Sequence, residues 1–316
     1  MHGIAITTTP ASVDPKSTNP IVCWRMMTRA SGSGCSAVGL IRIRGARKSF
    51  QAARKAKSVV GGQGRGQEGL ALTTVLETRH CDAIIMVGEL EDQPRLLADL
   101  RGSRLPVVAL WQGVAPLDFP SVEVDERAGT ILGLRHLVEL GHERIGFISA
   151  KLPGNNLLRE EAFIEFMKGR FGGLPDGYVQ RAPNSLAGGE AALRVLLNLS
   201  EPPTAVSAST DLTAVGVLHA AYGLGRTVPS GLSVIGWDDL TIAAYTVPGL
   251  TTLRMPTREI VAEGVRIAVE LAQDASASRE PRVTYYEPTL IVRESTAPMQ
   301  RPDALLRSQS PAGMHE

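Results

Sequence analysis

Short apolar runs alternate with amphipathic stretches from about residue 58 to the end of the chain. The runs have the length of buried strands, and the stretches between them repeat their apolar positions with helical spacing. Strands that alternate with amphipathic helices form parallel β-α-β units, so this pattern predicts an α/β fold with doubly wound parallel sheets. The predicted strands are 58–60, 83–87, 106–110, 121–124, 144–149, 204–208 and 232–236, and the predicted helices are 67–79, 92–102, 128–140, 157–170, 187–199, 212–223 and 256–273.

The two ends of the chain give different signals. Pro248 and the following LTTL at 250–253 predict a return strand, and YYEPTLIVRES near the C-terminus predicts one closing strand. Residues 1–36 are punctuated by Thr, Pro, Ser and Gly without a sustained period, which predicts an irregular segment. The stretch 38–57 predicts a basic helix.

Composition describes an ordinary globular protein of 316 residues, with 43% hydrophobic and 21% charged residues. The net charge of +1 favours no particular class of partner, but no acidic residue occurs between Pro15 and Gln67. A basic arm of this kind could contact DNA phosphates without sequence preference. A stretch translated from a disturbed reading frame would look the same.

Three cysteines without CxxC spacing indicate neither a disulfide framework nor a zinc site. No apolar run approaches the ~18 residues of a membrane-spanning helix. The N-terminus lacks the charged lead and the apolar length of a secretory signal. We therefore expect a cytoplasmic protein.

Catalytic motifs are not recognisable in the sequence. There is no Walker A, HExxH or GxSxG pattern. GRGQEG at 64–69 fits the dinucleotide motif GxGxxG, but Asp82 begins the next predicted strand, whereas a ribose-binding acid would end it. His142 lies at a helix-to-strand junction, where we expect a structural hydrogen bond. We predict no catalytic, cofactor-binding or metal-binding residues, and no enzyme.

Polar residues follow three predicted strands at their carboxyl ends, where open α/β sheets bind ligands. Arg159 opens the helix after 144–149, Thr210 follows 204–208, and Asp238 follows the strand in GLSVIGWDDL. An arginine donates to vicinal hydroxyl groups and a carboxylate accepts from them, so the set suits a polyhydroxylated ligand. Trp237 either lends its ring to that ligand or packs in the core, and we interpret Asp239 as a turn or cap residue.

A series of segments resembles the lactose-repressor/galactose-repressor (LacI/GalR) family of transcriptional regulators, in order and spacing, from about residue 68 to 298. The resemblance is to the family's effector-binding core. The segments are HCDAIIMVG, VEVDERAGTILGLRHLVELGHERIGFIS, LLREEAF, PPTAVSASTDLTAVGVLHAAYGLGRTVPSGLSVIGWDD, PGLTTLRMP and PTLIVREST.

The resemblance implies a periplasmic-binding-protein-like fold of two doubly wound lobes, joined by crossover strands, with an effector between them. By this likeness Arg159 and Asp238 match the family's effector-binding arginine and aspartate. Thr210 stands where the family usually has asparagine, Ala162 replaces a glycine, and Glu126 replaces an asparagine. The implied organisation is an irregular segment 1–36, an N-lobe of 37–140 plus 252–281, a C-lobe of 141–251 plus 282–298, and a disordered tail 299–316.

The front of the chain departs from the family, whose members begin with a helix-turn-helix headpiece that reads an operator. Residues 1–36 lack a recognisable headpiece, and 40–62 resemble a damaged first helix and second strand of the N-lobe. We therefore suspect a truncated or frame-disturbed gene product without its own intact DNA-binding domain.

The favoured function is the ligand-sensing and dimerisation core of a LacI/GalR-type regulator, with a carbohydrate or related small polar effector, a homodimer and family-level operator DNA as partners. The alternatives are a stand-alone solute-binding protein of the same fold and a nucleotide-dependent α/β enzyme. We expect Asp238→Ala and Arg159→Ala each to abolish effector binding with the fold largely intact.

Overall fold

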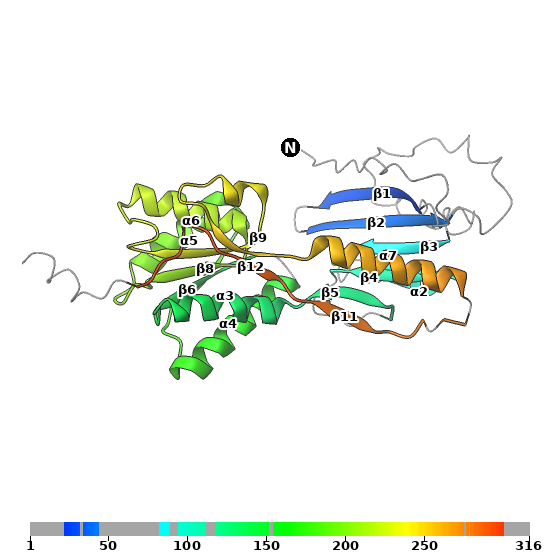
Figure 1. The fold of residues 1–316 in the computed structure, drawn as a ribbon, viewed down its shortest axis with the longest axis horizontal. Helices are drawn as coiled ribbons and strands as arrows, with labels where there is room; N and C mark the ends of the chain where they lie inside the picture. The colour runs from blue at the N-terminus through cyan, green and yellow to red at the C-terminus, as the bar shows by residue number, and fades with distance from the viewer. Residues whose placement is uncertain are drawn as a thin grey trace, which may run out of the picture.

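The computed structural model describes residues 22–31, 34–43, 82–88, 94–111, 118–151, 154–274, 276–277 and 279–299. Two six-stranded sheets follow each other along the long axis of the molecule (Figure 1). Their strands and helices confirm the predicted α/β fold. The elements are β1 (Val22–Ser31), β2 (Gly34–Ile43), β3 (Ala83–Val87), α2 (Pro94–Arg101), β4 (Val107–Leu110), β5 (Ser121–Val124), α3 (Glu126–Glu139), β6 (Ile145–Ala150), α4 (Asn155–Phe171), β7 (Val179–Ala182), α5 (Leu186–Leu197), β8 (Ala205–Ala208), α6 (Asp211–Gly223), β9 (Ser233–Asp238), the 3-10 helix η1 (Thr241–Ala244), β10 (Thr251–Arg254), α7 (Thr257–Gln273), β11 (Val283–Tyr286) and β12 (Thr289–Ile291).

The first sheet has the strand order β1-β2-β3-β4-β5-β11 and is parallel from β3 to β11. Its central strands are covered on both faces, because alternate residues point to opposite sides. Ile85 and Leu110 belong to the cluster that contains the apolar face of α7. Ile84 and Met86 pack instead with Leu100 of α2. This explains why 83–87 is apolar without interruption.

The second sheet has the order β12-β10-β9-β8-β6-β7, and only its edge strand β12 runs antiparallel within it. Phe147 and Ile235 pack on the side of α3 and α4, where Phe147 stacks on Phe163 with 4.8 Å between ring centroids. Ile148 and Val234 pack on the opposite side, with α5 and α6. The carboxyl ends of β6, β8 and β9 meet at one edge of this sheet.

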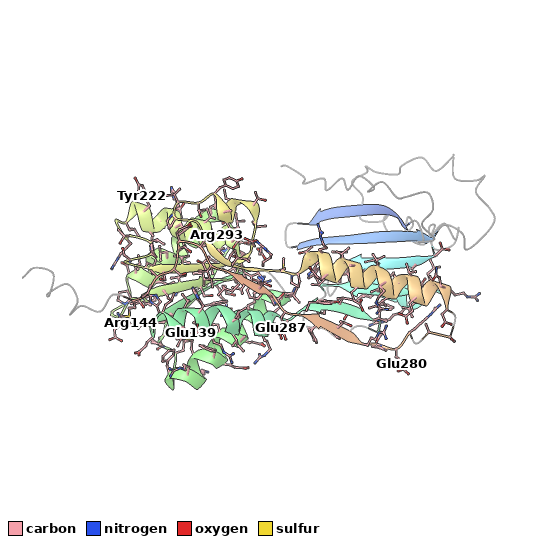
Figure 2. The ribbon with its side chains drawn as sticks, viewed as in Figure 1. Glu139, Arg144, Tyr222, Glu280, Glu287 and Arg293 are labelled. Atoms are coloured by element: carbon pink, nitrogen blue, oxygen red, sulfur yellow. The ribbon has the colours of Figure 1, made fainter. Side chains whose placement is uncertain are left out.

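The described chain passes between the two sheets at three places: after β5, after β10, and between β11 and β12 (Figure 1). Two of these passages are bonded together, because the Asp125 backbone N–H donates to the Tyr286 carbonyl at 2.9 Å. Glu287 follows directly in the third passage (Figure 2). The lobe boundary near residue 140 stays a prediction; α3, which it assigns to the N-lobe, contacts α4, β8, β10 and β12.

Strands β1 and β2 differ from the sequence-based expectation. Residues 22–31 form an antiparallel strand within the segment predicted to be irregular, and Ser31 pairs with Gly34 across the hairpin. The helix predicted over 38–57 is wrong for residues 38–43, which belong to β2, while 44–57 lie outside the described residues. The dipeptide Gly32-Ser33 is typical of a two-residue hairpin turn, and the prediction of an irregular segment did not take it into account.

Two other differences concern the second half of the chain. Strand β7 was not predicted, because its residues VQRA mix polar and apolar character at a half-exposed sheet edge. The single closing strand is in fact two strands: β11 pairs with β5 of the first sheet, and β12 pairs with β10 of the second. Pro288 stands at the break between them, where it offers no backbone donor to a strand ladder.

Candidate functional site

The sequence-predicted residues lie at the carboxyl edge of the second sheet. Arg159 is on the second turn of α4, Thr210 caps α6, and Asp238 ends β9. Arg159 and Thr210 are each 5% exposed. Chain segments that are far apart in the sequence therefore meet at one place, because parallel strands carry their following loops to the same edge.

Arg159 is fixed by contacts on three sides. Its Nε donates to Glu126 Oε2 at 2.7 Å, and one terminal nitrogen donates to the Ser209 carbonyl at 2.5 Å. The guanidinium also stacks over the Trp237 ring, 4.1 Å from the ring centroid. Planar stacking and forked donation are properties of arginine that lysine lacks. The remaining N–H groups of the guanidinium have no hydrogen-bond partner among the described residues, so they are available to donate to a ligand.

Trp237 is 3% exposed and belongs to the core cluster on the α3 side of the sheet. Gly129 of α3 lies so close that a Cβ there would approach the Trp237 ring to 2.4 Å, which only glycine avoids. Because the Arg159 guanidinium stacks on one face of the ring, Trp237 helps to hold that guanidinium in place. A direct contact between this ring and an effector stays a prediction.

Asp238 stands beside Arg159 with an unusual backbone and an unusual carboxyl group. Its φ of 117° lies in the left-handed region, which non-glycine residues adopt at a cost and often at functional sites. Burial raises the pKa of the Asp238 carboxyl to about 7; Arg159 opposes this change, and the carboxyl groups of Asp211 and Glu126 add to it. Asp238 is therefore divided between protonated and ionised forms near neutral pH.

Asp211 is the second buried acid at this edge, with no exposed surface. Its two oxygens accept from Thr252 Oγ1 at 2.5 Å and from the Leu240 backbone N–H at 2.7 Å. Burial raises the pKa of Asp211 to about 6, and those two hydrogen bonds oppose the increase. Asp211 thus ties the start of α6 to β10 and to the loop after β9.

Thr210 has a structural role in the described geometry. Its hydroxyl accepts from the Thr213 backbone N–H as the N-cap of α6. The same hydroxyl donates to Asn184 Oδ1 at 2.8 Å. Its neighbour Ser209 contributes the carbonyl that holds Arg159. Effector contact by Thr210 stays a prediction, since both roles of its hydroxyl already have partners.

The carboxylate of the next residue, Asp239, is occupied by two arginines and is not free to contact a ligand. Its carboxylate accepts from Arg254 Nε at 2.6 Å and from a terminal nitrogen of Arg293 at 2.7 Å. Arg293 follows β12 and lies against the β9–β10 region (Figure 2). Burial alone would raise the pKa of Asp239, but these hydrogen bonds hold it below its ordinary value. We call these three residues the Asp239 clamp. Asp239 is structural through these ion pairs, and it is Asp211 whose carboxylate accepts from a backbone N–H of the following loop, at Leu240.

His142 confirms its predicted structural role. The ring is 3% exposed, and its nitrogens contact Thr204 Oγ1 at 2.9 Å and Ser233 Oγ at 3.0 Å. Burial lowers its pKa, so the neutral ring is favoured.

In the described ranges, no group of three or more His, Cys, Asp or Glu side chains is arranged to hold a metal ion. None of the described helices is both long and apolar enough to cross a membrane. The motif at 64–69 lies outside the described residues.

Glu126 and Asn156 are candidate site residues that the sequence reasoning did not select. Glu126 was noted only as a departure from the family, yet it is the carboxylate partner of Arg159. Asn156 lies one turn before Arg159 on α4 and is 5% exposed. Its spacing of three residues from Arg159 was the available signal, because such pairs share a helix face. We call Glu126, Asn156, Arg159, Trp237 and Asp238 the Arg159 cluster.

Comparison with known proteins decides the family. The model of the periplasmic binding protein-like domain matches residues 134–296. The transcriptional regulator MalR of Streptomyces coelicolor is 33% identical over 236 residues, which cover 72% of this chain and 67% of that protein. The chain belongs to the LacI/GalR family of transcriptional regulators. It contains the effector-binding domain of that family and spans about two thirds of the length of the curated relatives it matches.

Solved structures agree with this assignment. A LacI-family regulatory protein from Chloroflexus aggregans is 26% identical, with a TM-score of 0.66 over 73% of this chain and 82% of that chain. The regulator CelR, solved as its cellobiose complex, is 27% identical, with a TM-score of 0.62 over 73% of this chain and 70% of that chain.

Proposed function

We propose that the Arg159 cluster binds a small polyhydroxylated effector, with Arg159 and Asp238 as its main polar contacts. The observation that carries this proposal is their arrangement: a stacked guanidinium with unused N–H groups beside a carboxyl group held in left-handed backbone. Donor and acceptor then face the same space, as vicinal hydroxyl groups require. The cellobiose complex of CelR supports a carbohydrate as the effector class.

The proposed effector works by binding and not by chemical conversion. Ligand contact at the edge where the chain passes between the sheets would favour one arrangement of the sheets over another. A ligand shifts such an equilibrium by its difference in affinity for the two states. In a complete regulator this shift would change operator affinity. The similarity to transcriptional regulators supports this function over that of an enzyme or a stand-alone solute-binding protein. A cytoplasmic location follows from the same proposal.

A homodimer is part of the proposal. Four apolar side chains between residues 240 and 247 are well exposed: Leu240 at 46%, Ile242 at 48%, Tyr245 at 77% and Val247 at 98%. An apolar group of this kind on a globular protein is typical of a protein–protein contact. Sedimentation of the intact chain and of Val247→Asp would test it, and a monomer at all concentrations would contradict it. Operator binding by this chain is tested separately, by a gel shift at increasing salt concentration. Binding through phosphate contacts alone should be lost as the salt concentration rises.

The effector site is tested by thermal unfolding of the intact chain with mono- and disaccharides, including cellobiose, and with nicotinamide and adenine nucleotides. A sugar at a hundredfold excess over its Kd should stabilise the fold by about 2.7 kcal/mol. Asp238→Ala should remove this stabilisation, because the acceptor for the sugar hydroxyls is lost.

Asp176→Ala, in an exposed loop, is the matched control and should leave sugar binding unchanged. Stabilisation by a nucleotide alone would contradict the proposal. Full sugar affinity in Asp238→Ala would show that the site lies elsewhere.

A further inference from the structure

Two buried oxygen acceptors in the Arg159 cluster lack a hydrogen-bond partner within the described part of the chain. They are Glu126 Oε1 and Asn156 Oδ1. The Glu126 side chain is 1% exposed and Asn156 is 5% exposed, so bulk solvent has little access to these oxygens. An unpaired buried acceptor costs about 1–3 kcal/mol. A ligand that supplies donors would recover this free energy.

Glu126 Oε1 belongs to the same space as Arg159. The other oxygen of that carboxylate, Oε2, accepts from Arg159 Nε, so the unpaired oxygen lies beside the guanidinium. Asn156 precedes Arg159 by one turn on α4, and α4 packs against α3, which carries Glu126. The two acceptors therefore approach the cluster from neighbouring helices.

The charges around Asp238 are unbalanced. Its carboxyl group interacts with the carboxyl groups of Asp211 and Glu126, and with the guanidinium of Arg159 as the opposing charge. Around Asp238, two neighbouring carboxyl groups thus oppose one guanidinium in a poorly solvated place, which is why the pKa of Asp238 is raised and not lowered. The two further arginines nearby, Arg254 and Arg293, are already paired with Asp239. A second cation is what this arrangement lacks.

From these contacts we propose that the effector is a polyol that carries a cationic amine, an amino sugar in chemical class, with the ammonium group on Glu126 and Asp238. An ammonium group has only donors, which match the unpaired oxygens. The sugar hydroxyls then accept from the unused N–H groups of Arg159. This inference rests on the proposed function, since it takes the Arg159 cluster as the effector site.

Other ligand classes fit less well. A phosphorylated or carboxylated sugar would add negative charge beside three acids, and Arg159 already donates to Glu126. A neutral sugar could donate hydroxyl groups to Glu126 and Asn156. It would leave the excess of carboxyl groups uncompensated, and desolvated charges without a counter-charge are unfavourable.

The experiment compares matched sugars on the intact chain by calorimetry at pH 7. The probes are glucose, glucosamine and N-acetylglucosamine, and the corresponding galactose series. The amine should bind about tenfold tighter than the hydroxyl parent and the N-acetyl form, because one charge-assisted hydrogen bond is worth about that factor. In Glu126→Gln the preference should fall to about threefold or less. This comparison of amine with N-acetyl sugar in the unaltered chain needs no variant to fold.

Glu139→Gln is the matched control, because Glu139 is exposed at the far end of the same helix (Figure 2). It should keep the full preference for the amine. Equal or tighter binding of the neutral parent sugar would overturn the amino-sugar inference and leave the proposed function standing. Binding of no sugar in either series would overturn both. An amine preference that Glu126→Gln leaves intact would overturn the role of Glu126.

Discussion

Asp238 and Asp239 are neighbours in the chain, yet their carboxyl groups lie in opposite electrostatic surroundings. Asp238 has Arg159 as its opposing charge and the carboxyl groups of Asp211 and Glu126 beside it, and its pKa is raised to about 7. Asp239 accepts hydrogen bonds from Arg254 and Arg293, and these bonds lower its pKa. Both residues have positive φ, at 117° and 54°, so the backbone turns sharply between them and sends the side chains to different partners. One strand end can therefore carry a proposed binding group and a structural group side by side.

The largest effect should follow from removing the cation of the Arg159 cluster. Arg159→Ala leaves the Glu126 carboxylate buried without a counter-charge, and breaking such a pair costs about 3 kcal/mol or more. The pairing therefore changes the earlier expectation that this substitution leaves the fold largely intact. Urea unfolding at pH 8 measures the loss.

Two variants sharpen this prediction. Arg159→Ala combined with Glu126→Gln should regain part of the lost stability, since residue 126 then carries no buried charge that needs the guanidinium. Arg127→Ala, which breaks an exposed pair with Glu165, should cost only about 0.5 kcal/mol. Equal losses for Arg127→Ala and Arg159→Ala would show that burial of the Glu126 pair carries no extra weight.

An intermediate effect should follow from opening the Asp239 clamp. Asp239→Ala removes the acceptor of Arg254 and Arg293, and we expect a loss of about 2 kcal/mol in unfolding free energy, because both hydrogen bonds are charge-assisted but Arg254 is half exposed. Sugar affinity should change little by comparison with Asp238→Ala. Chemical denaturation and calorimetry on the two variants test both halves. A stable Asp239→Ala protein that cannot bind sugar would reverse the assigned roles.

The smallest effect is a pH dependence that belongs to Asp238. Its carboxyl binds a proton more tightly in the folded chain than in the unfolded chain, since the pKa rises from 3.8 to about 7. The folded form is thus penalised progressively as pH rises through this window. Asp238→Asn should become more stable relative to the unaltered chain between pH 6 and 7.5, by on the order of 1 kcal/mol.

Because this prediction compares the stabilities of two proteins, the contributions of titrating groups that both contain cancel. Burial lowers the pKa values of His136 and His142, and these rings act in the opposite direction below pH 6.5 in both proteins. A difference in stability that stays constant with pH would contradict the assigned environment of Asp238.

Much of the fold could be predicted because apolar periodicity reports burial directly. The fully apolar 83–87 and 106–110 became β3 and β4, and the stretches 157–170 and 212–223 became α4 and α6. Elements whose residues mix polar and apolar character were not predicted correctly. Strand β7 is half exposed, and β11 and β12 were predicted as one strand because only Glu287 and Pro288 separate them. Strand pairing is a long-range contact, which local periodicity does not record.

The site was predictable in part for the same reason. The carboxyl ends of strands can be located from the sequence, so Arg159 and Asp238 could be placed at one edge. The direction of each side chain could not. Glu126 points at Arg159, and the Thr210 hydroxyl is taken up by its helix cap, and both facts depend on how α3, α4 and α6 pack. Their effector roles stay predictions.

The bond between Asp125 and Tyr286 gives Glu126 a mechanical position that its chemistry alone does not suggest. Asp125 joins two of the three passages between the sheets, and its side chain accepts from the Ala128 backbone N–H at 2.8 Å. Glu126 is attached one peptide bond further along. A displacement of the Glu126 carboxylate would therefore reach the junction of two connecting segments through a single peptide bond. Both segments, after β5 and after β11, would then move together, and the cores of the two sheets need not rearrange.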